Sequence, residues 1–539
     1  MTIVPVRGVG DIGVIADLPS YDLPLKAWAS ARNVRFRDGV VTKSGAFKAL
    51  NALPTLTAEP AGILDASNAG SQGYIVVPYR DGAITQVVGP TQTNVSPTPA
   101  WTAFTTKLTS CKVGGVTYIN NNDNRPIYRS TPTAGVFSYV PGWPTDDRAL
   151  SLRAFKDYVI GLNITKAGVN YPNMVKWSAA VSAGSPPADW DVTSLSSHAG
   201  ENVLNDAAGK LIDGVPLGNS FILYGNTETY LMSFIGTPLI FSFDKLFDDL
   251  GVLSQDCAVE VDGKHYVFGS SGIYVHDGQT KLCISDRKVT KHIYSRLDQS
   301  KATRCHVWRN PTKQEVIFAY PSIGSDTKWG LYQCKGCNEG AVYNITTGSW
   351  SFIDLPSTVG VSLAAMPALP LWSTLATWDT LSTIWTSFEG SEPPLPITIS
   401  TGGGPDSASP RINFYDDGQS GFLANPIDSA FVTSSWMETS IRDSDEMGSG
   451  LATLKLFRSV HPQIKVVAGD MCVKILVGVA NTPYEAVSWS PVQEFFPATQ
   501  YKADFRKTGR YVTLRFEVPS SAEVEITGYD FDIDLLAMR

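Results

Sequence analysis

The sequence predicts an all-β protein. Glycine and proline are abundant, with 46 and 34 positions among 539 residues. Short runs rich in Val, Ile, Tyr and Phe alternate with turn dipeptides such as Asp-Gly, and helical periodicity is nearly absent. Frequent turns between short strands favour β structure over helical bundles. The length exceeds one ordinary core, so two or three domains or one large repeating architecture are expected.

The first element is the stretch RGVGDIGVIADLP, which carries Gly8, Gly10 and Gly13 in the spacing G-x-G-x-x-G. In dinucleotide-binding folds these glycines follow a strand and open a helix whose N-terminus faces the pyrophosphate. Pro19 and Pro24 follow too closely for such a helix to run. The sequence therefore predicts a flexible loop here and no nucleotide site.

The clearest repeat unit lies at Cys257–Ser285. Asp262-Gly263, Ser270–Gly272 and Asp277-Gly278 separate four short runs of strand-forming residues, which predicts a four-stranded meander. Similar units lie at Gly73–Val88, Cys111–Ser130, Leu152–Ile164, Gly218–Phe234, Cys305–Ser322 and Gly340–Pro356. They recur about every 40 to 50 residues, the interval typical of β-propeller blades, and predict a propeller of about six blades.

The clearest helical pattern is DRKVTKHIYSRL at Asp286–Leu297. Val289, Ile293 and Leu297 share one face, while Arg287, Lys288 and Lys291 lie mostly elsewhere. One interpretation is a solvated helix packed on a blade, and the other is a basic helix near DNA.

The order of these patterns predicts four segments. Residues 1–55 join a platform and residues 56–363 form the propeller. Residues 364–424, rich in Pro, Ser, Thr and Gly, form an excursion or tip that contains Trp372, Trp378 and Trp385. Residues 425–539 return to alternating strands and predict a C-terminal β domain.

Composition limits the function classes. The formal net charge is −8, so no global basic field draws the chain to nucleic acid or to an anionic membrane. The first residues do not read as a signal peptide and no apolar run reaches a membrane span, so we expect a soluble protein.

Seven cysteines, an odd number over a long chain, favour reduced thiols over a disulfide scaffold. Cys334 and Cys337 form a C-x-x-C pair, but Cys283, Cys305 and His306 do not supply a second pair of zinc-ligand spacing. Free thiols near a turn are expected, and metal binding at this pair stays open.

No pattern points to catalysis. The sialidase Asp-box, G-x-S-x-G, H-E-x-x-H and the P-loop are all absent from the sequence. Asp81, Asp157, Asp262 and Asp277 are explained by turn chemistry. We therefore expect no enzymatic activity and no cofactor.

The N-terminal block DLPSYDLPLKAWASARNVRFRDGVVTKSGAFKAL resembles the start of the tail nozzle proteins of short-tailed bacteriophages, also called tail tubular protein B or packaged-DNA stabilisation proteins. The resemblance rests here on Trp28, Asn33–Gly39 and Gly45. Further matches are VKWSAAVSAGSPPADW with Trp177 and Trp190, GSSGIYVHDGQTKLCISDRKV, AVYNITTGSW and GRYVTLRFEVPSSAEVEITGYDFDI.

The resemblance implies a β-propeller with additional β domains, assembled in the bacterial host cytoplasm into a ring of six subunits in the virion tail. Such a ring lies below the head-to-tail adaptor, near tail fibres or spikes, and continues the DNA channel. It retains the packaged genome and passes double-stranded DNA during ejection without sequence specificity, and no small-molecule substrate is expected. Arg287, Lys288 and Lys291 are then candidates for the DNA channel, and Trp372, Trp378 and Trp385 for a tip or docking region.

The acidic balance suits a conduit, because many Lys and Arg contacts to phosphates would slow the sliding of DNA. The alternative is a receptor-binding tail protein that recognises or cleaves glycans on the host surface, with Trp372, Trp378 and Trp385 stacking on carbohydrate. A ring of six distinguishes the nozzle from a trimeric spike.

Overall fold

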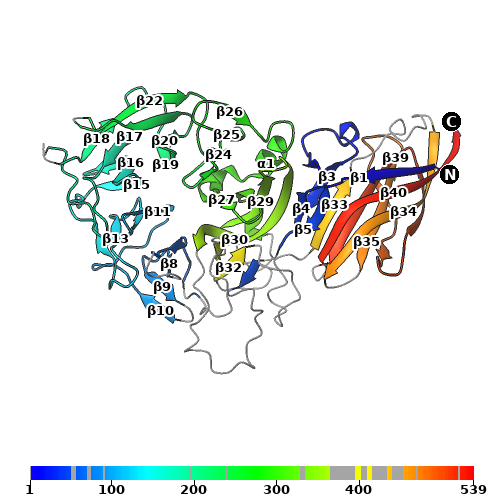
Figure 1. Ribbon diagram of the computed structural model, residues 1–539, viewed down its shortest axis with the longest axis horizontal. Coiled ribbons are helices and arrows are strands. Elements are labelled where there is room, and N and C mark those ends of the chain that lie inside the picture. Colours follow the sequence, from blue (N-terminus) through cyan, green and yellow to red (C-terminus); the bar gives the residue numbers. More distant parts are fainter. Residues whose placement is uncertain are drawn as a thin grey trace.

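A ring of sheets and a sandwich of two sheets lie side by side in the computed structural model (Figure 1). Among the described residues, the one α-helix is α1 (Thr290–Arg296), and no helix is long and apolar enough to cross a membrane. The structure describes residues 2–45, 47–49, 56, 58–68, 74–88, 91–193, 197–237, 239–327, 334–364, 395–401, 410–415, 434–439, 453–468, 472–519 and 523–538.

Five separate four-stranded antiparallel sheets make up most of the ring, and in each sheet the strands follow chain order. They are β7 (Leu64–Asp65), β8 (Ile75–Pro78), β9 (Ile84–Val88) and β10 (Thr91–Asn94); β11 (Leu108–Val113), β12 (Val116–Asn121), β13 (Ile127–Arg129) and β14 (Ser138–Tyr139); β15 (Arg148–Phe155), β16 (Tyr158–Lys166), β17 (Val169–Trp177) and β18 (Gly200–Val203); β19 (Leu211–Leu217), β20 (Ser220–Gly225), β21 (Thr229–Phe234) and β22 (Phe241–Phe247); β23 (Ala258–Val261), β24 (Lys264–Phe268), β25 (Ile273–His276) and β26 (Lys281–Cys283). This is the β-propeller that the repeat interval predicts.

The predicted meander at Cys257–Ser285 is the fifth of these sheets, β23–β26. Asp262 and Gly263 take φ values of 52° and 74°, as the two central residues of a hairpin turn with left-handed backbone require. Asp-Gly supplies both conformations with little strain, which explains why the local sequence predicts this blade so well.

The sixth blade is formed by β27 (His306–Asn310), β28 (Glu315–Tyr320), β29 (Cys337–Asn344) and the first half of β30 (Trp350–Ala364). The second half of β30 pairs with β31 (Leu395–Ser400), β31 with β32 (Arg411–Tyr415), and β32 with β6 (Phe47–Ala49). Since β6 precedes the first blade and the other strands follow the sixth, this sheet closes the ring at a seventh position. Ile397, Ile399 and Ile412 pack there on Val77 and Val87 of the first blade.

The closing sheet changes the interpretation of residues 364–424. β31 and β32 lie inside the segment predicted as an excursion, but they are buried strands of the ring. The two strands have only 6 and 5 residues, and the flanking sequence is rich in Pro, Ser and Gly, so the sequence pattern does not reveal them.

The second body is a β-sandwich built from both ends of the chain. One sheet has the order β38-β34-β40-β5-β4, with β1 also paired to β40, and the other continues β2-β3-β33-β39-β35 to β36 and β37. Its strands are β1 (Thr2–Arg7), β2 (Gly13–Val14), β3 (Ala27–Arg32), β4 (Val34–Arg37), β5 (Val40–Lys43), β33 (Ser434–Thr439), β34 (Thr453–Ala468), β35 (Val473–Ala480), β36 (Ser488–Trp489), β37 (Gln493–Phe495), β38 (Ala503–Gly509), β39 (Tyr511–Pro519) and β40 (Glu523–Met538).

Trp28 lies at the centre of the sandwich core. Its side chain is 1% exposed, and its ring centroid lies 6.4 Å from that of Phe36 on one sheet and 6.2 Å from that of Phe516 on the other. Its indole Nε1 donates to the carbonyl of Val9 at 2.7 Å, so the polar atom of this buried ring is satisfied.

The glycine-rich N-terminal stretch joins the two bodies. Gly13 of β2 pairs in parallel with Trp350 of β30 on one side and with Ala27 of β3 on the other, so one sheet runs from the sixth blade into the sandwich. A Cβ on Gly13, whose φ is +79°, would lie 2.8 Å from the Trp350 carbonyl oxygen, and one on Gly10 would lie 2.2 Å from the Val40 carbonyl oxygen. The predicted flexible loop is wrong here: the glycines allow close packing at a buried joint.

We expect Trp28→Ala to lower the free energy of unfolding of the sandwich by about 3 to 5 kcal/mol, because a large buried ring and its hydrogen bond are lost. Trp28→Phe should cost clearly less, since it retains most of the apolar contact. Chemical denaturation followed by circular dichroism checks both values, and equal stability of Trp28→Ala and the parent chain would contradict this packing role.

Candidate functional site

A group of ion pairs fastens the sandwich to the sixth blade. We call Arg32, Arg35, Glu315, Glu339 and Asp354 the junction network. Arg35 of β4 grips Glu315 of β28 through both carboxylate oxygens, with Nη2 to Oε2 at 2.9 Å, and the two side chains are 10% and 1% exposed. Arg32 of β3 reaches Glu339 at 2.8 Å and Asp354 at 3.4 Å. Two parallel hydrogen bonds from a guanidinium to a carboxylate fix the relative orientation of the two side chains as well as their distance.

Asn33, between these arginines, completes the joint with hydrogen bonds. Its φ of 57° turns the backbone so that its side-chain Nδ2 donates to Asp354 at 3.0 Å and its Oδ1 accepts from the Asp354 amide at 2.9 Å. Asparagine tolerates the left-handed region better than most residues. The stretch Asn33–Gly39 thus acts as a docking hairpin between the two bodies.

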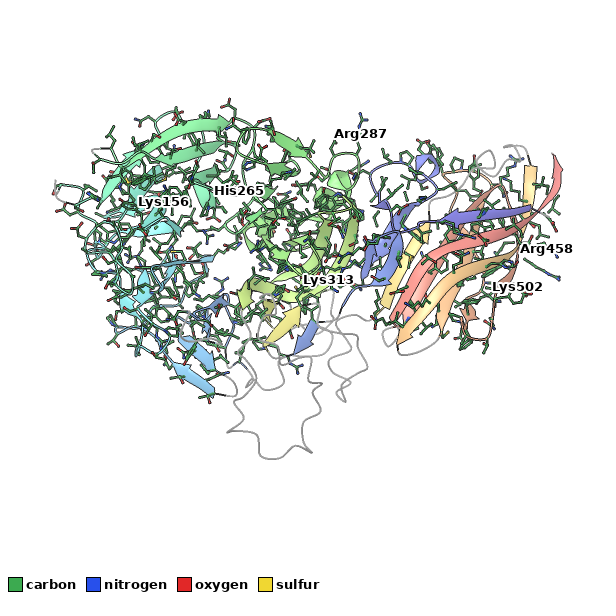
Figure 2. All side chains as sticks on the ribbon, in the orientation of Figure 1. Lys156, His265, Arg287, Lys313, Arg458 and Lys502 are labelled. Carbon is green, nitrogen blue, oxygen red and sulfur yellow. The ribbon has the colours of Figure 1, made fainter. Side chains whose placement is uncertain are left out.

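The predicted channel candidates lie beside this joint. The carbonyl of Lys288 accepts from the amides of Ala16 and Asp17, and the carboxylate of Asp17 accepts from the amide of Lys291 at 2.9 Å. Arg287 is exposed next to α1, at the outer boundary of the ring (Figure 2).

Helix α1 follows the predicted pattern, because Val289, Ile293 and Leu297 are all buried. The structure thus supports a helix packed on the ring, with its basic residues at the edge next to the sandwich. Trp372, Trp378 and Trp385 lie outside the described residues.

Both cysteines of the C-x-x-C pair are buried, and Cys337 is the first residue of β29. Cys337 Sγ lies 3.7 Å from His306 Nδ1, and Cys334 Sγ bonds to the Gly336 carbonyl at 3.4 Å. Burial raises the pKa of the Cys334 thiol, and all seven cysteines are free. Among the described residues, no group of three or more His, Cys, Asp and Glu side chains is arranged to hold a metal ion.

A cavity of about 390 Å³ lies on the axis of the propeller. It is lined from all seven positions of the ring by Ile63, Leu108, Arg153, Val215, Ala258, Val307 and Val361. Each of these residues lies on, or one position before, the innermost strand of its sheet, as the axis of a propeller requires.

The charges of this axial cavity neutralise one another. Arg153 bonds Asp213 at 2.6 and 2.8 Å and Asp256 at 2.6 Å, and Lys107 lies 3.6 Å from Asp256. Burial works against the charged form of Arg153, but the two carboxylates raise its pKa overall. These side chains come from four different blades, so their ion pairs link the blades to one another. No sequence motif predicts this network.

A second buried polar group connects the fourth and fifth blades. The Gly278 amide donates to His276 Nδ1 at 3.3 Å, so the proton of His276 is on Nε2, which donates to Tyr224 Oη at 2.6 Å. Tyr224 donates to His265 Nδ1 at 2.7 Å, and His265 Nε2 donates to the Pro216 carbonyl at 2.9 Å. Every proton has an acceptor only while both histidines are neutral.

Comparison with known proteins gives no family and no function. No family model matches the chain, and no curated protein matches it. Among solved structures it is similar to the WD40 β-propeller domain of Doa1, at 11% identity and a TM-score of 0.38, covering 68% of this chain and 97% of that one. It is also similar to the computationally designed Ika8 protein, at 9% identity and a TM-score of 0.35, and to the β-propeller domain of Cps50 (Swd1) from Myceliophteria thermophila, at 7% and 0.37; each pair covers 68% of this chain and 99% of the other. The assignment of a propeller rests on the strand pairing itself.

We expect Arg35→Gln to lower the free energy of unfolding by about 3 to 5 kcal/mol, because it removes the positive charge and the paired hydrogen bonds that Arg35 gives to the buried Glu315 carboxylate. Arg37→Gln in the same hairpin is the matched control, since Arg37 pairs with an exposed Asp38 and should change stability by about 0.5 kcal/mol or less. Urea titration measures both variants. Equal effects would show that the junction network does not hold the two bodies together.

The histidine pair predicts acid sensitivity. Burial lowers the pKa of His276 from 6.5 to about 3. Its stabilising contribution is therefore complete above about pH 6.5 and is lost as the pH falls below that value, by up to about 1.4 kcal/mol per pH unit. His276→Gln should flatten the fall in unfolding free energy between pH 6.5 and 5, whereas His198→Gln at an exposed site should leave it unchanged. Parallel pH curves for all three proteins would refute this role.

Proposed function

We propose that the chain is a structural subunit of the tail nozzle of a short-tailed bacteriophage. Six copies would form a ring below the head-to-tail adaptor that continues the DNA channel, retains the packaged genome and passes it during ejection. The subunit would act without catalysis and without a cofactor.

The proposal rests on the positions in the fold of the residues that resemble the tail nozzle proteins. Trp28 is the centre of the sandwich core, and Asn33–Gly39 is the hairpin that docks on the sixth blade. The C-terminal motif forms β39 and β40, and β40 pairs with both β1 and β5. Segments from opposite ends of the chain therefore build one body, joined firmly to a propeller, which is the architecture the resemblance implies.

The mechanical properties of the fold suit this role. A conduit subunit must keep its shape while DNA moves past it, and here a continuous sheet and the junction network both cross between the two bodies. The negative net charge suits a lumen in which DNA slides, since fewer phosphate contacts mean less salt-dependent binding.

The basic residues beside the joint have a place in this proposal. Arg287 and Lys291 are exposed, and no carboxylate among the described residues forms an ion pair with either. If this edge faced the lumen, they would act as a local brake on DNA without making the whole channel basic. Their assignment to the channel stays a prediction.

We expect the purified protein, alone or with its adaptor, to form a ring with six-fold symmetry and a central channel. Native light scattering gives the mass, and two-dimensional class averages of electron micrographs give the symmetry. Six subunits support the proposal. A trimer, or a persistent monomer that binds or cleaves host glycans, would overturn it in favour of a receptor-binding protein.

A further inference from the structure

The propeller axis opens at one end into a second cavity of about 730 Å³. Lys107 and Arg304 lie just before β11 and β27, and Val359 lies at the start of the half of β30 that pairs with β31, so this mouth is the end of the ring where the innermost strands begin. Ala61, Lys107 and Val359 line both cavities, so the two cavities are adjacent along the axis. A cavity of this volume is in the range of small-molecule sites.

The lining of this mouth is cationic. Arg80, Lys107, Lys301, Arg304 and Lys335 contribute positive charge, against the carboxylates of Glu59 and Asp326. Three of the five cations are already paired, because Lys335 contacts Glu59, Lys301 lies 2.7 Å from Asp326, and Lys107 lies 3.6 Å from Asp256.

The two arginines differ from these lysines. Arg80 Nη1 donates to the Thr106 carbonyl at 2.5 Å, and Arg304 Nη1 donates to the Cys334 carbonyl at 3.3 Å. Within the part of the chain that the structure describes, neither guanidinium forms an ion pair with a carboxylate, so each retains donors for a ligand. Burial lowers the pKa of Arg80, Glu59 raises it, and the nearby Arg304 lowers it again. An anion held by both arginines would relieve this repulsion.

A buried polar atom on the same axis also lacks a partner. His306 is 3% exposed and lines the first cavity, and its Nε2 has no hydrogen-bond partner among the described residues. Its Nδ1 lies 3.1 Å from the Arg304 carbonyl, to which it donates, so Nε2 is an acceptor. The mouth thus offers donors for an anion, and the adjacent axial cavity offers a hydrogen-bond acceptor.

We propose that this axial mouth binds a small phosphate monoester with a polar, hydroxyl-bearing tail, and that Arg80 and Arg304 hold its phosphate group. Guanidinium groups match the oxygen geometry of phosphate by paired hydrogen bonds. The site would hold its ligand without chemical turnover. The proposal does not depend on the nozzle function, because it concerns a single subunit.

The test is calorimetric titration of the full chain with glycerol 3-phosphate and with inorganic phosphate, at constant ionic strength adjusted with sodium chloride. We expect saturable binding of both at one shared site. Arg304→Gln and Arg80→Gln should each weaken the affinity about ten-fold or more, because each removes charge-assisted hydrogen bonds. Arg304→Lys, which keeps the charge but not the fork, should weaken it less than Arg304→Gln.

The control is Arg287→Gln, which removes one exposed cation far from the axis and should leave the affinity unchanged (Figure 2). Circular dichroism confirms that each variant is folded, and a variant that is not folded is replaced by the second arginine's variant. Binding that does not saturate, or that is equal in all variants, would overturn the proposal. A DNA duplex that binds with the same dependence on Arg80 and Arg304 would overturn the assignment to a small molecule.

Discussion

The parallel pairing of two residues, Gly13 and Val14, holds the architecture together. This short strand lies between β3 of the sandwich and β30 of the sixth blade, and among the described strands it is the one that joins the two bodies into a single sheet. The arrangement depends on the absence of a side chain at Gly13, because a Cβ would collide with Ser349 and Trp350. The junction network also fixes the orientation of the two bodies, because the Arg35 guanidinium donates to both oxygens of Glu315 in one geometry. The two bodies are consequently joined by a shared sheet and by buried ion pairs.

The sequence predicts those parts of the fold that local chemistry determines. Asp262-Gly263, Asp277-Gly278 and Asp38-Gly39 all mark real hairpins, because the required backbone conformations belong to the dipeptides themselves. The apolar face of α1 is equally local. The all-β class and the meander of the fifth blade follow from such signals, but the predicted units Cys305–Ser322 and Gly340–Pro356 turn out to be two halves of one blade.

Long-range pairing explains what the sequence does not predict. β2 has two residues and β6 has three, too few for any periodicity, and the partners of β6 come some hundreds of residues later. Arg35 meets Glu315 across 280 positions, and Asp213 meets Arg153 across 60, so no spacing rule links them. The same limit applies to the axial mouth, because Arg80 and Arg304 lie far apart in the sequence and neither belongs to a recognisable motif.

The closing sheet of the ring has a consequence for folding during synthesis. During synthesis the inner blades emerge as local meanders and can form early, but β6 has no partner until β32 has left the ribosome. The first blade therefore waits with an uncovered flank, and Val77 and Val87 stay exposed until Ile397 and Ile399 arrive. Synthesis of β31 and β32 thus determines when the apolar flank of the first blade is covered and can no longer associate with other nascent chains.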